Sequence, residues 1–332
     1  MNYELSICIP TYNRAVYLVE LLKSILRQFD DQNSNKIEIC ISDNASTDNT
    51  KNIIDEYVNK YKNIKYRRNH ENLGFDKNVM SAVLMASGKY CWLFGSDDIM
   101  CEGAINKILF ELQYGYDVYF FNRIDCDAEM NIKGNWFFMK ENVQSRIFHF
   151  GTDDLFTEYL ESIKNMGGLF DYLSTTLFKK SKWDSVEFDE DFIGTAYSYT
   201  SVILSFLKKE ATLKYMRDFL VMYRIGNDNF SASGAAKRAK IDFDGFNLLF
   251  FKIFNNDSKF IKYYVKYIKK HYSYRHILAI LINSNIQERE ELIHSARFIY
   301  NKNILNFLVV FALSLRFLYR KTFKNLIASK KT

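Results

Sequence analysis

Two adjacent carboxylates, Asp97 and Asp98, stand at the end of a short apolar run over residues 90–94. The run predicts a buried strand, and the turn Gly95-Ser96 then delivers both acids to the rim of an α/β sheet, where ligands bind. Paired carboxylates suit a divalent cation and a phosphate-bearing substrate, because Mg²⁺ takes only one or two protein carboxylates and fills its other positions with water and phosphate oxygens. A solvated turn that caps the next helix is the alternative.

Similar polar clusters follow other apolar runs in the first 122 residues, and helical patterns separate these runs. Strands that alternate with helices at this spacing predict βαβ units and a mostly parallel sheet. The clusters therefore converge on one edge of that sheet. They are Pro10-Thr11-Tyr12-Asn13-Arg14, Asp43-Asn44-Ala45-Ser46-Thr47-Asp48-Asn49-Thr50 and Asn72-Leu73-Gly74-Phe75.

The pattern changes after residue 122. Residues 123–150 are predicted to be irregular, and from residue 235 onward everything is predicted to be helical. The expected architecture is an α/β fold with a helical C-terminal extension. The expected units are one domain over 1–232, whose first half (1–122) carries the predicted phosphate-ligand edge and whose second half is 123–232, and a helical region over 233–332.

The composition is that of a globular protein, with 332 residues, 48% hydrophobic and 25% charged. The net charge of +6 is unevenly placed, because no acidic residue follows Glu291. Such a basic tail favours an anionic partner, although a solvated tail is the alternative. The apolar stretch over 304–315 is too short to span a bilayer and suits a buried or interfacial helix. The basic residues are Arg297, Lys302, Arg316, Arg320, Lys321, Lys324, Lys330 and Lys331.

In this order and spacing, the four polar clusters resemble those of family 2 glycosyltransferases with a GT-A-type fold. The resemblance covers residues 3–122 well, is weaker over 170–232 and is absent beyond that. Within the family, the sequence looks most like the branch of abequosyltransferase-like and other surface-polysaccharide enzymes. The resemblance implies an inverting transfer of a sugar from a nucleotide diphosphate sugar to an acceptor hydroxyl.

The resemblance also implies roles for the donor-side residues. Asp98 would ligate Mn²⁺ or Mg²⁺, and Asp97 would serve as a second ligand that leans toward the donor ribose and sugar. An extra acid often precedes this pair by two positions in the family, where this chain has Gly95. The residues expected to line the nucleotide pocket are Thr11, Asn13, Asp43, Asn44, Asn72, Gly74 and Asp97, with Arg224 as a phosphate clamp on a loop that includes Ser231 and Ser233.

Asp43 matches the family acid that reads the base. A carboxylate only accepts hydrogen bonds when ionised, so it can pair with the imide N–H of uracil or thymine but not with cytosine. We therefore expect a UDP- or dTDP-sugar as the donor. A turn aspartate that caps a helix is the alternative role for Asp43.

An inverting enzyme needs a general base near the acceptor hydroxyl. Family members supply it from an acidic pair a few residues beyond a Phe-Asp-Glu segment, but Tyr197 and Ser198 occupy that place here. The candidate bases are Asp191 first, then Asp189, Glu190 and Asp171. A helix-capping acid run is the alternative for residues 189–191.

The sequence thus predicts a metal-dependent glycosyltransferase that builds a bacterial surface glycan on a glycan or polyprenyl-linked acceptor. We expect it in the cytoplasm, because no leader pattern is visible and five unpaired cysteines suit a reducing compartment. The C-terminal helices suit either the inner membrane face or a homo-oligomer. A nucleic-acid partner is not expected, since no recognised module accompanies the basic residues. The rival hypotheses are a sugar nucleotidyltransferase and a degenerate nucleotide-sugar or glycan-binding protein.

Overall fold

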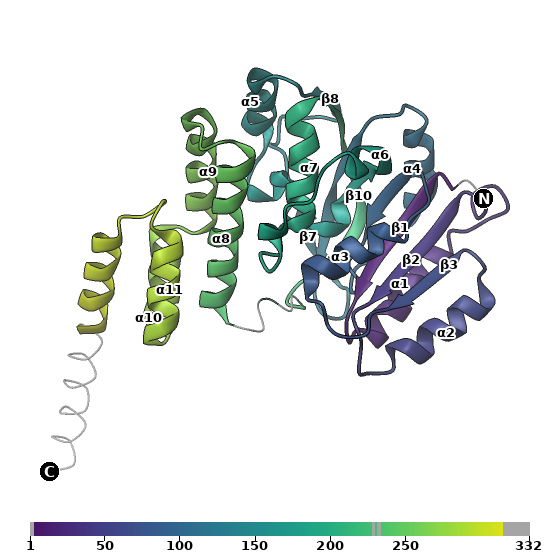
Figure 1. Cartoon of the computed structure of the whole chain (residues 1–332), viewed down its shortest axis with the longest axis horizontal. Helices are drawn as coiled ribbons and strands as arrows, with labels where there is room; N and C mark the ends of the chain where they lie inside the picture. Colours follow the sequence, from purple (N-terminus) through teal and green to yellow (C-terminus); the bar gives the residue numbers. More distant parts are fainter. Residues whose placement is uncertain (1–2, 228–229, 231–233, 315–332) are drawn as a thin grey trace, which may run out of the picture.

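The computed structural model describes residues 3–227, 230 and 234–314 (Figure 1). These residues form a ten-stranded sheet in the order β3-β2-β1-β4-β9-β6-β10-β5, with β7 paired to β6 and β8 paired to β10. The strands are β1 (Leu5–Thr11), β2 (Ile37–Asp43), β3 (Ile64–Arg68), β4 (Tyr90–Leu93), β5 (Ile99–Met100), β6 (Val118–Cys126), β7 (Ile132–Trp136), β8 (Arg146–His149), β9 (Thr176–Lys179) and β10 (Thr212–Arg224).

The strands β3, β2, β1 and β4 are parallel neighbours. Strand β9 lies antiparallel between β4 and β6, and β6 pairs parallel with β10. Two successive antiparallel pairings restore the direction, so β6 and β10 run with β1. The predicted mostly parallel sheet is confirmed, and the carboxyl ends of β1, β2 and β4 meet at one edge.

Helices cover both faces of the sheet because successive strand side chains point to opposite faces. Ile7 and Ile9 of β1 pack with α1, α2 and α4, whereas Cys8 packs with α3 in the core on the other face. The helices are α1 (Ala15–Leu26), α2 (Thr50–Lys60), α3 (Phe75–Leu84), α4 (Ala104–Leu112), α5 (Asp153–Ser162), α6 (Lys180–Asp184), α7 (Ser198–Lys209), α8 (Ala235–Ile253), α9 (Ser258–His271), α10 (Tyr274–Asn283) and α11 (Ile286–Ala296).

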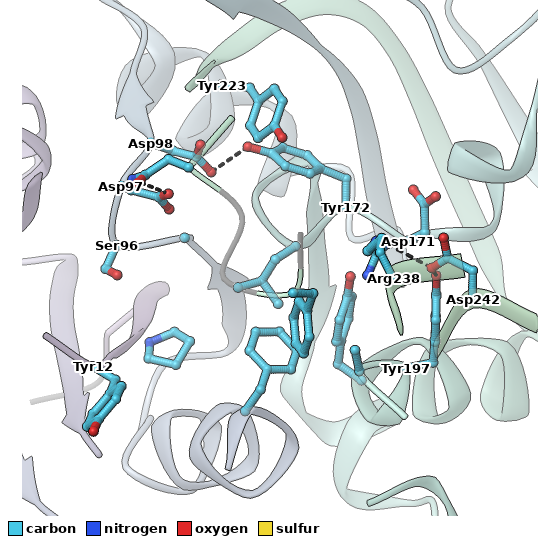
Figure 2. A pocket seen from close by; sticks show the side chains of 18 of the residues that line it. Tyr12, Ser96, Asp97, Asp98, Asp171, Tyr172, Tyr197, Tyr223, Arg238 and Asp242 are labelled. Carbon is cyan, nitrogen blue, oxygen red and sulfur yellow. Dashed lines mark hydrogen bonds and ion pairs between the residues drawn. The ribbon is translucent and has the colours of Figure 1, made fainter. Parts of the chain in front are cut away.

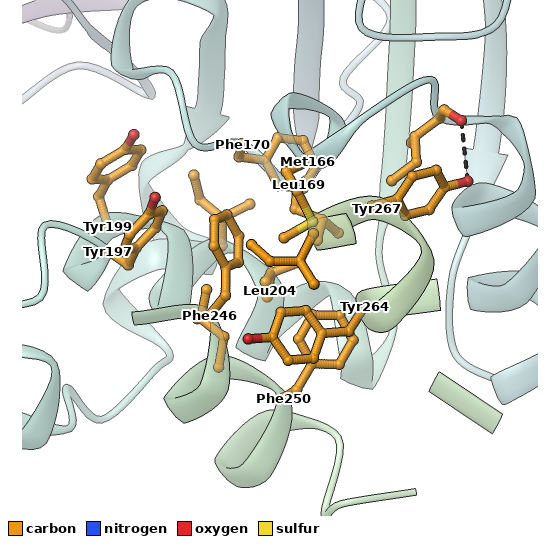
Figure 3. Packing of buried hydrophobic residues seen from close by; sticks show 14 of the residues in the cluster. Met166, Leu169, Phe170, Tyr197, Tyr199, Leu204, Phe246, Phe250, Tyr264 and Tyr267 are labelled. Carbon is orange, nitrogen blue, oxygen red and sulfur yellow. Dashed lines mark hydrogen bonds between the residues drawn. The ribbon is translucent and has the colours of Figure 1, made fainter. Parts of the chain in front are cut away.

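The C-terminal helices share the core of the second face. Phe246 and Phe250 of α8 belong to the same cluster as Leu204 of α7, and Phe250 stacks on Tyr264 of α9 with ring centroids 4.6 Å apart (Figure 3). Residues on either side of position 232 therefore form one continuous apolar interior, and helices α8 and α9 are held against the sheet domain by packing.

Two parts of the chain differ from the local expectation. Residues 123–150, predicted to be irregular, contain the end of β6 and the strands β7 and β8, which pair at the antiparallel side of the sheet. The apolar runs over 213–216 and 219–223 predict two short strands, but they form the single strand β10, with register shifts near Phe219. A β-bulge lets one strand bend without ending, although the apolar pattern is interrupted there.

Residues 302–314 are helical and end the described part of the chain. Leu305 and Val309 are buried, whereas Ile304, Phe307 and Phe311 are about half exposed or more. No helix among the described residues is long and apolar enough to cross a bilayer. The predicted loop residues Ser231 and Ser233, and the basic residues from Arg316 onward, lie outside the described residues.

Candidate active site

A cavity of about 850 Å³ lies at the carboxyl edge of the sheet and extends to the C-terminal helices (Figure 2). One end is lined by the loops after β1, β2, β3 and β4, and we call it the donor end. The other end is lined by residues before β9 and by α7 to α10, and we call it the acceptor end. The donor end includes Thr11, Arg14, Asn44, Asn72, Gly74, Asp97 and Asp98; the acceptor end includes Asp171, Tyr197, Tyr199, Arg238, Asp242, His271 and His276.

The acidic turn after β4 stands where the sequence predicts it. The Oδ2 atom of Asp98 accepts hydrogen bonds from the Tyr172 hydroxyl at 2.6 Å and from the Ser174 hydroxyl at 2.5 Å. Burial and the adjacent Asp97 charge raise the pKa of Asp98 to about 7. Burial also raises the pKa of Asp97, against the opposing effect of Arg14, whose Nη1 lies 3.9 Å from its carboxylate. A buried acid, Asp98, and a partly exposed acid, Asp97, thus lie side by side, and Arg14 is the cation that pairs with Asp97.

The acidic turn fits a cation that is held jointly with a phosphate group. No group of three or more His, Cys, Asp or Glu side chains is placed to hold a metal within the described ranges. Gly95 leaves no room for a third acid, because a Cβ there would lie 2.8 Å from the Asp98 carboxylate. Mg²⁺ needs only one or two protein carboxylates when water and phosphate complete its shell. Asp97 and Asp98 suffice for such a site.

Asp43 ends β2 directly beside Thr11 of β1 and is fully buried. Its Oδ1 accepts from the backbone N–H of Ser46 at 2.9 Å, and its Oδ2 accepts from the Tyr66 hydroxyl at 2.9 Å, with Arg68 Nε at 3.5 Å. The carboxylate does not line the cavity. The structure therefore places Asp43 behind the nucleotide edge, where it holds the loop that follows β2.

Asparagine side chains connect the donor-end loops. The Asn44 amide donates to Asn72 Oδ1 at 2.7 Å and to the Gly74 carbonyl at 3.1 Å, so the loops after β2 and β3 form one wall. Asn13 has a left-handed backbone (φ 52°), and its side-chain oxygen accepts from the Thr47 N–H at 2.7 Å, outside the cavity lining. Gly74 has φ 81°, which favours glycine at the start of α3.

The Thr11 hydroxyl is buried at the cavity wall and has no hydrogen-bond partner within the part of the chain that the structure describes. A buried hydroxyl without a partner is costly, so its position indicates that a polar ligand group belongs beside it.

Arg224 lies in a different place from the predicted phosphate clamp. Its guanidinium is almost fully buried and donates to the Asp97 carbonyl at 3.3 Å, to the Ala128 carbonyl and to Glu20. These partners hold it behind the acidic turn, outside the cavity lining. Arg14, which the sequence reasoning left aside, lines the cavity and donates to the Asn227 carbonyl at 2.6 Å.

The acid run 189–191 also lies away from the cavity. The carboxylates of Asp189 and Asp191 both pair with Lys252 of α8, at 2.5 Å for Asp189, and Glu190 is exposed. None of the three residues lines the cavity. The run therefore joins a surface loop to α8, because exposed acids at the start of a short helical turn are readily paired by a nearby lysine.

Two acids, Asp171 and Asp242, line the cavity at its acceptor end, and Asp171 is the one that the loop before β9 supplies (Figure 2). It follows Phe170, whose backbone is left-handed at φ 63°, an uncommon conformation for a bulky residue. Burial raises the pKa of Asp171, and the Arg123 charge opposes this shift. No residue within the described ranges donates a hydrogen bond to its carboxylate, which leaves the group available to a ligand.

Arg123 supplies positive charge between the two ends of the cavity. Its guanidinium lies 4.2 and 4.1 Å from the ring centroids of Tyr172 and Tyr223, two rings that meet edge to face, and its Nε bonds Asp125 at 2.8 Å. A guanidinium that contacts two rings in this way is held by cation–π attraction. Sequence reasoning missed Arg123 because its neighbours come from three distant segments.

A buried network joins three helices at the acceptor end. The Asp242 carboxylate accepts from the Tyr197 hydroxyl at 2.6 Å and from the Tyr272 hydroxyl at 2.5 Å, and it forms an ion pair with Arg238 at 2.8 Å. Gly245 makes this packing possible, since a Cβ there would lie 2.1 Å from the Tyr197 ring. Tyr197, which replaces the expected acid, thus directs its hydroxyl to an acid that α8 supplies.

A parallel sheet with paired carboxylates at its carboxyl edge, continuous with a second site that bears a free acid, defines a group transferase of the nucleotide-binding α/β class. Residues 6–160 match the family model described as glycosyl transferase family 2. The chain is 35% identical to the abequosyltransferase RfbV of Salmonella typhimurium, over 91% of each chain. The protein belongs to glycosyl transferase family 2 and is a glycosyltransferase.

Two further proteins are similar to the chain, one in sequence and one in fold. It is 27% identical to the GalNAc(5)-diNAcBac-PP-undecaprenol beta-1,3-glucosyltransferase of Campylobacter jejuni, over 78% of this chain and 76% of the other. The structure of TarS (residues 1–349) from S. aureus in complex with UDP-GlcNAc superposes with a TM-score of 0.65 and 17% identity, covering 89% of this chain and 79% of that one. The GT-A-type fold expected from the sequence is confirmed.

Proposed function

We propose that this glycosyltransferase transfers a sugar from a nucleotide diphosphate sugar, bound at Asp97 and Asp98, to an acceptor hydroxyl that Asp171 deprotonates. The observation that supports this proposal is the single cavity in which the paired acids and the free acid lie. A displacement with two substrates needs one site that holds the leaving group and, across from it, a base for the attacking hydroxyl. The paired acids at the sheet edge would provide the first, and Asp171 would provide the second.

We expect the donor to be a UDP- or dTDP-sugar. The complex of TarS with UDP-GlcNAc supports this choice by analogy of fold alone. Both oxygens of Asp43 already accept hydrogen bonds from the chain, so we propose that the loop it holds, with Asn44 and Asn72, surrounds the base. Titration calorimetry with UDP, dTDP, CDP and GDP tests this, and tighter binding of CDP or GDP would contradict it.

A divalent cation, Mn²⁺ or Mg²⁺, would be held by Asp98 and Asp97 together with the donor diphosphate. When bound, it neutralises the charge that develops on the leaving diphosphate. The chain's own residues orient this end of the site. Tyr172 and Ser174 fix the Asp98 carboxylate, and Arg224 holds the turn through the Asp97 carbonyl.

Asp171 takes the role of base in place of residues 189–191, which are bound to Lys252 on the surface. Its carboxylate accepts the proton of the acceptor hydroxyl while the hydroxyl oxygen bonds to the anomeric carbon of the donor sugar. The bond from that carbon to the diphosphate oxygen breaks, and the nucleoside diphosphate leaves with the electron pair. Attack opposite the leaving group inverts the anomeric configuration.

The test is to incubate the protein with candidate donors, Mn²⁺ and a lipid-linked or free glycan acceptor, and to follow release of nucleoside diphosphate. Proton NMR of the product reports the anomeric configuration. Transfer with inversion, abolished by EDTA, is the expected result. Nucleotide binding without any turnover, once an acceptor preparation of the native glycan is supplied, would contradict the proposal.

We further propose that residues 1–232 carry the transfer chemistry and that the end of the helical region contacts the inner membrane face. The exposed apolar side chains of residues 302–314, followed in sequence by basic residues without acids, support this location. Truncation after residue 300 is expected to abolish sedimentation with anionic vesicles. If truncation instead changes only the mass measured by ultracentrifugation, the face is a homo-oligomer interface.

A further inference from the structure

A basic segment spans the end of α9 and the start of α10, at the acceptor end of the cavity. Five of its eight residues, over 269–276, are Lys, Arg or His, and all five are exposed. We call this segment the basic rim. It contains Lys269, Lys270, His271, Arg275 and His276.

The basic rim opens directly onto the cavity. His271 and His276 line it, together with Tyr272, whose hydroxyl is fixed by the buried Asp242. The ring of Tyr272 contacts both histidine rings, with centroids 4.7 Å from His271 and 5.4 Å from His276. The network that shapes the acceptor end therefore also sets the position of the rim.

The rim cations have no acidic partner within ion-pair distance in the described part of the chain. Lys270 donates only to the Lys164 carbonyl, at 3.0 Å, and Lys269 lies over the Tyr300 ring. Elsewhere in the helical region, Lys252 of α8 and Lys259 of α9 each pair with an aspartate. The two histidines line the cavity, and Lys269, Lys270 and Arg275 flank them on the exposed surface outside the lining. Lysine and arginine side chains beside a cavity mouth, without acids to neutralise them, attract an anion.

The location of the rim restricts which anion would bind there. Asp171 and His271 line the same end of the cavity, so a sugar whose hydroxyl reaches Asp171 would direct the rest of the acceptor toward the rim. Lysine and arginine are common ligands of phosphate groups in proteins. The basic rim lies where the part of the acceptor farthest from Asp171 would leave the cavity.

We propose that the basic rim binds the phosphate groups of an acceptor whose sugar is carried on a diphosphate. This inference rests on the proposed function, because it assigns the acceptor end of that same site. The acceptor sugar would lie against Tyr199 and Asp171, and its diphosphate would lie between the rim cations. Recognition of the carrier would then come from the helical region, which the family model matching residues 6–160 does not include.

The test measures binding of geranyl diphosphate by calorimetry, with UDP and Mg²⁺ saturating the donor end. The rim variant is Lys270→Gln with Arg275→Gln, two exposed positions whose change leaves the core intact. The control variant is Lys262→Gln with Lys266→Gln, which removes the same charge from exposed positions of α9 that precede the basic rim and do not adjoin the histidines that line the cavity.

The wild type and the control variant are expected to bind geranyl diphosphate. The dissociation constant of the rim variant should be larger by roughly tenfold or more, because two charged contacts are lost. Equal affinity in all three proteins would overturn the proposal. Loss of binding to vesicles of phosphatidylglycerol, with geranyl diphosphate binding unchanged, would assign the rim to membrane headgroups instead and would also overturn it.

Release of nucleoside diphosphate from the donor, measured in the same preparations, separates this inference from the proposed function. If donor turnover is absent from the wild type while rim binding follows the expected pattern, the proposed function fails and the anion site stands. If turnover is present and the rim variant binds like the control, the anion site fails and the proposed function stands.

Discussion

The two ends of the cavity are built in different ways. The donor end consists of loops that each follow a parallel strand, and its acids Asp97 and Asp98 are adjacent in the sequence. The acceptor end draws Asp171, Arg238 and His271 from segments separated by long stretches of chain. Loops after parallel strands meet at one edge whatever their sequence, whereas the acceptor end depends on how helices pack.

Charge is arranged for a separate task at each end of the cavity. Asp98 accepts two hydrogen bonds from hydroxyls, which orient it without neutralising it. Asp242 accepts two hydrogen bonds, is also paired with Arg238, and serves as a structural anchor. Asp171 accepts none within the described residues, which suits an acid that must take a proton from a substrate.

The largest expected effect concerns the donor end. Replacing Asp98 with Asn preserves the shape of the side chain but removes the charge, so transfer should fall by on the order of 10³-fold or more. The fold should persist, because the substitution relieves repulsion with Asp97. Product formation and circular dichroism measure the two effects, and transfer at the wild-type rate would disprove the metal assignment.

A second prediction concerns the scaffold beneath the donor end. Glu38 of β2 is buried and accepts from the Ser6 hydroxyl at 2.6 Å and from the Ser87 N–H at 2.6 Å, with Lys65 Nζ at 2.6 Å. Burial opposes its ionisation, but these contacts together lower the pKa of Glu38. Glu38→Gln should reduce the free energy of unfolding at pH 7 by about 2 kcal/mol, as expected for lost bonds to a charged group.

The sign of the pH dependence follows from that lowered pKa. The contribution of Glu38 is complete above its unfolded value of about 4.3 and is lost as the pH falls through the folded value. Urea unfolding at pH 7 and at pH 3 should therefore show a larger difference between wild type and variant at pH 7. An equal difference at both values would refute the ionised role of Glu38.

At the acceptor end, Tyr197→Phe should lower the free energy of unfolding by about 1 to 2 kcal/mol, because the buried Asp242 loses one donor. The Michaelis constant for the acceptor should rise, while that for the donor should not change. Thermal unfolding and steady-state kinetics measure these effects. A rise in the Michaelis constant for the donor alone would show that the two ends of the cavity do not bind their substrates independently.

The smallest effect is expected outside the cavity. Asp189→Asn with Asp191→Asn breaks the exposed pairing to Lys252 and should change stability by less than about 1 kcal/mol, with transfer close to the wild-type rate. Steady-state kinetics of the double variant test this directly. A large loss of the turnover number would restore the surface acids as candidates for the base and remove Asp171.

The sequence predicts the donor end well because its signals are local. Each apolar run predicts a strand, and the polar residues that follow, such as Asp97 and Asn44, are carried to the sheet edge by the fold. What those side chains bond to is not local. Arg224 is held by Glu20 and Ala128, and Asp43 by Tyr66, so neither could be assigned to the protein interior from its own neighbours in the sequence.

The acceptor end was largely invisible in the sequence. The spacing of Arg238 and Asp242, one turn apart on α8, looks like an ordinary surface pair on a helix. Only the packing of Tyr197 against Gly245 shows that this face of α8 is turned toward the cavity. The acid run 189–191 gave a stronger local signal than Asp171, which stands alone in an apolar stretch.

In the proposed mechanism, Asp171 acts on the acceptor and not on the donor. The most direct measurement compares wild type and Asp171→Asn, using the nucleotide sugar that the binding panel selects. The proposed role of Asp171 predicts that the variant binds the donor with unchanged affinity by calorimetry and has a turnover number about 10² to 10⁴-fold lower than the wild type. Transfer at the wild-type rate, or loss of donor binding equal to the loss of transfer, would contradict it.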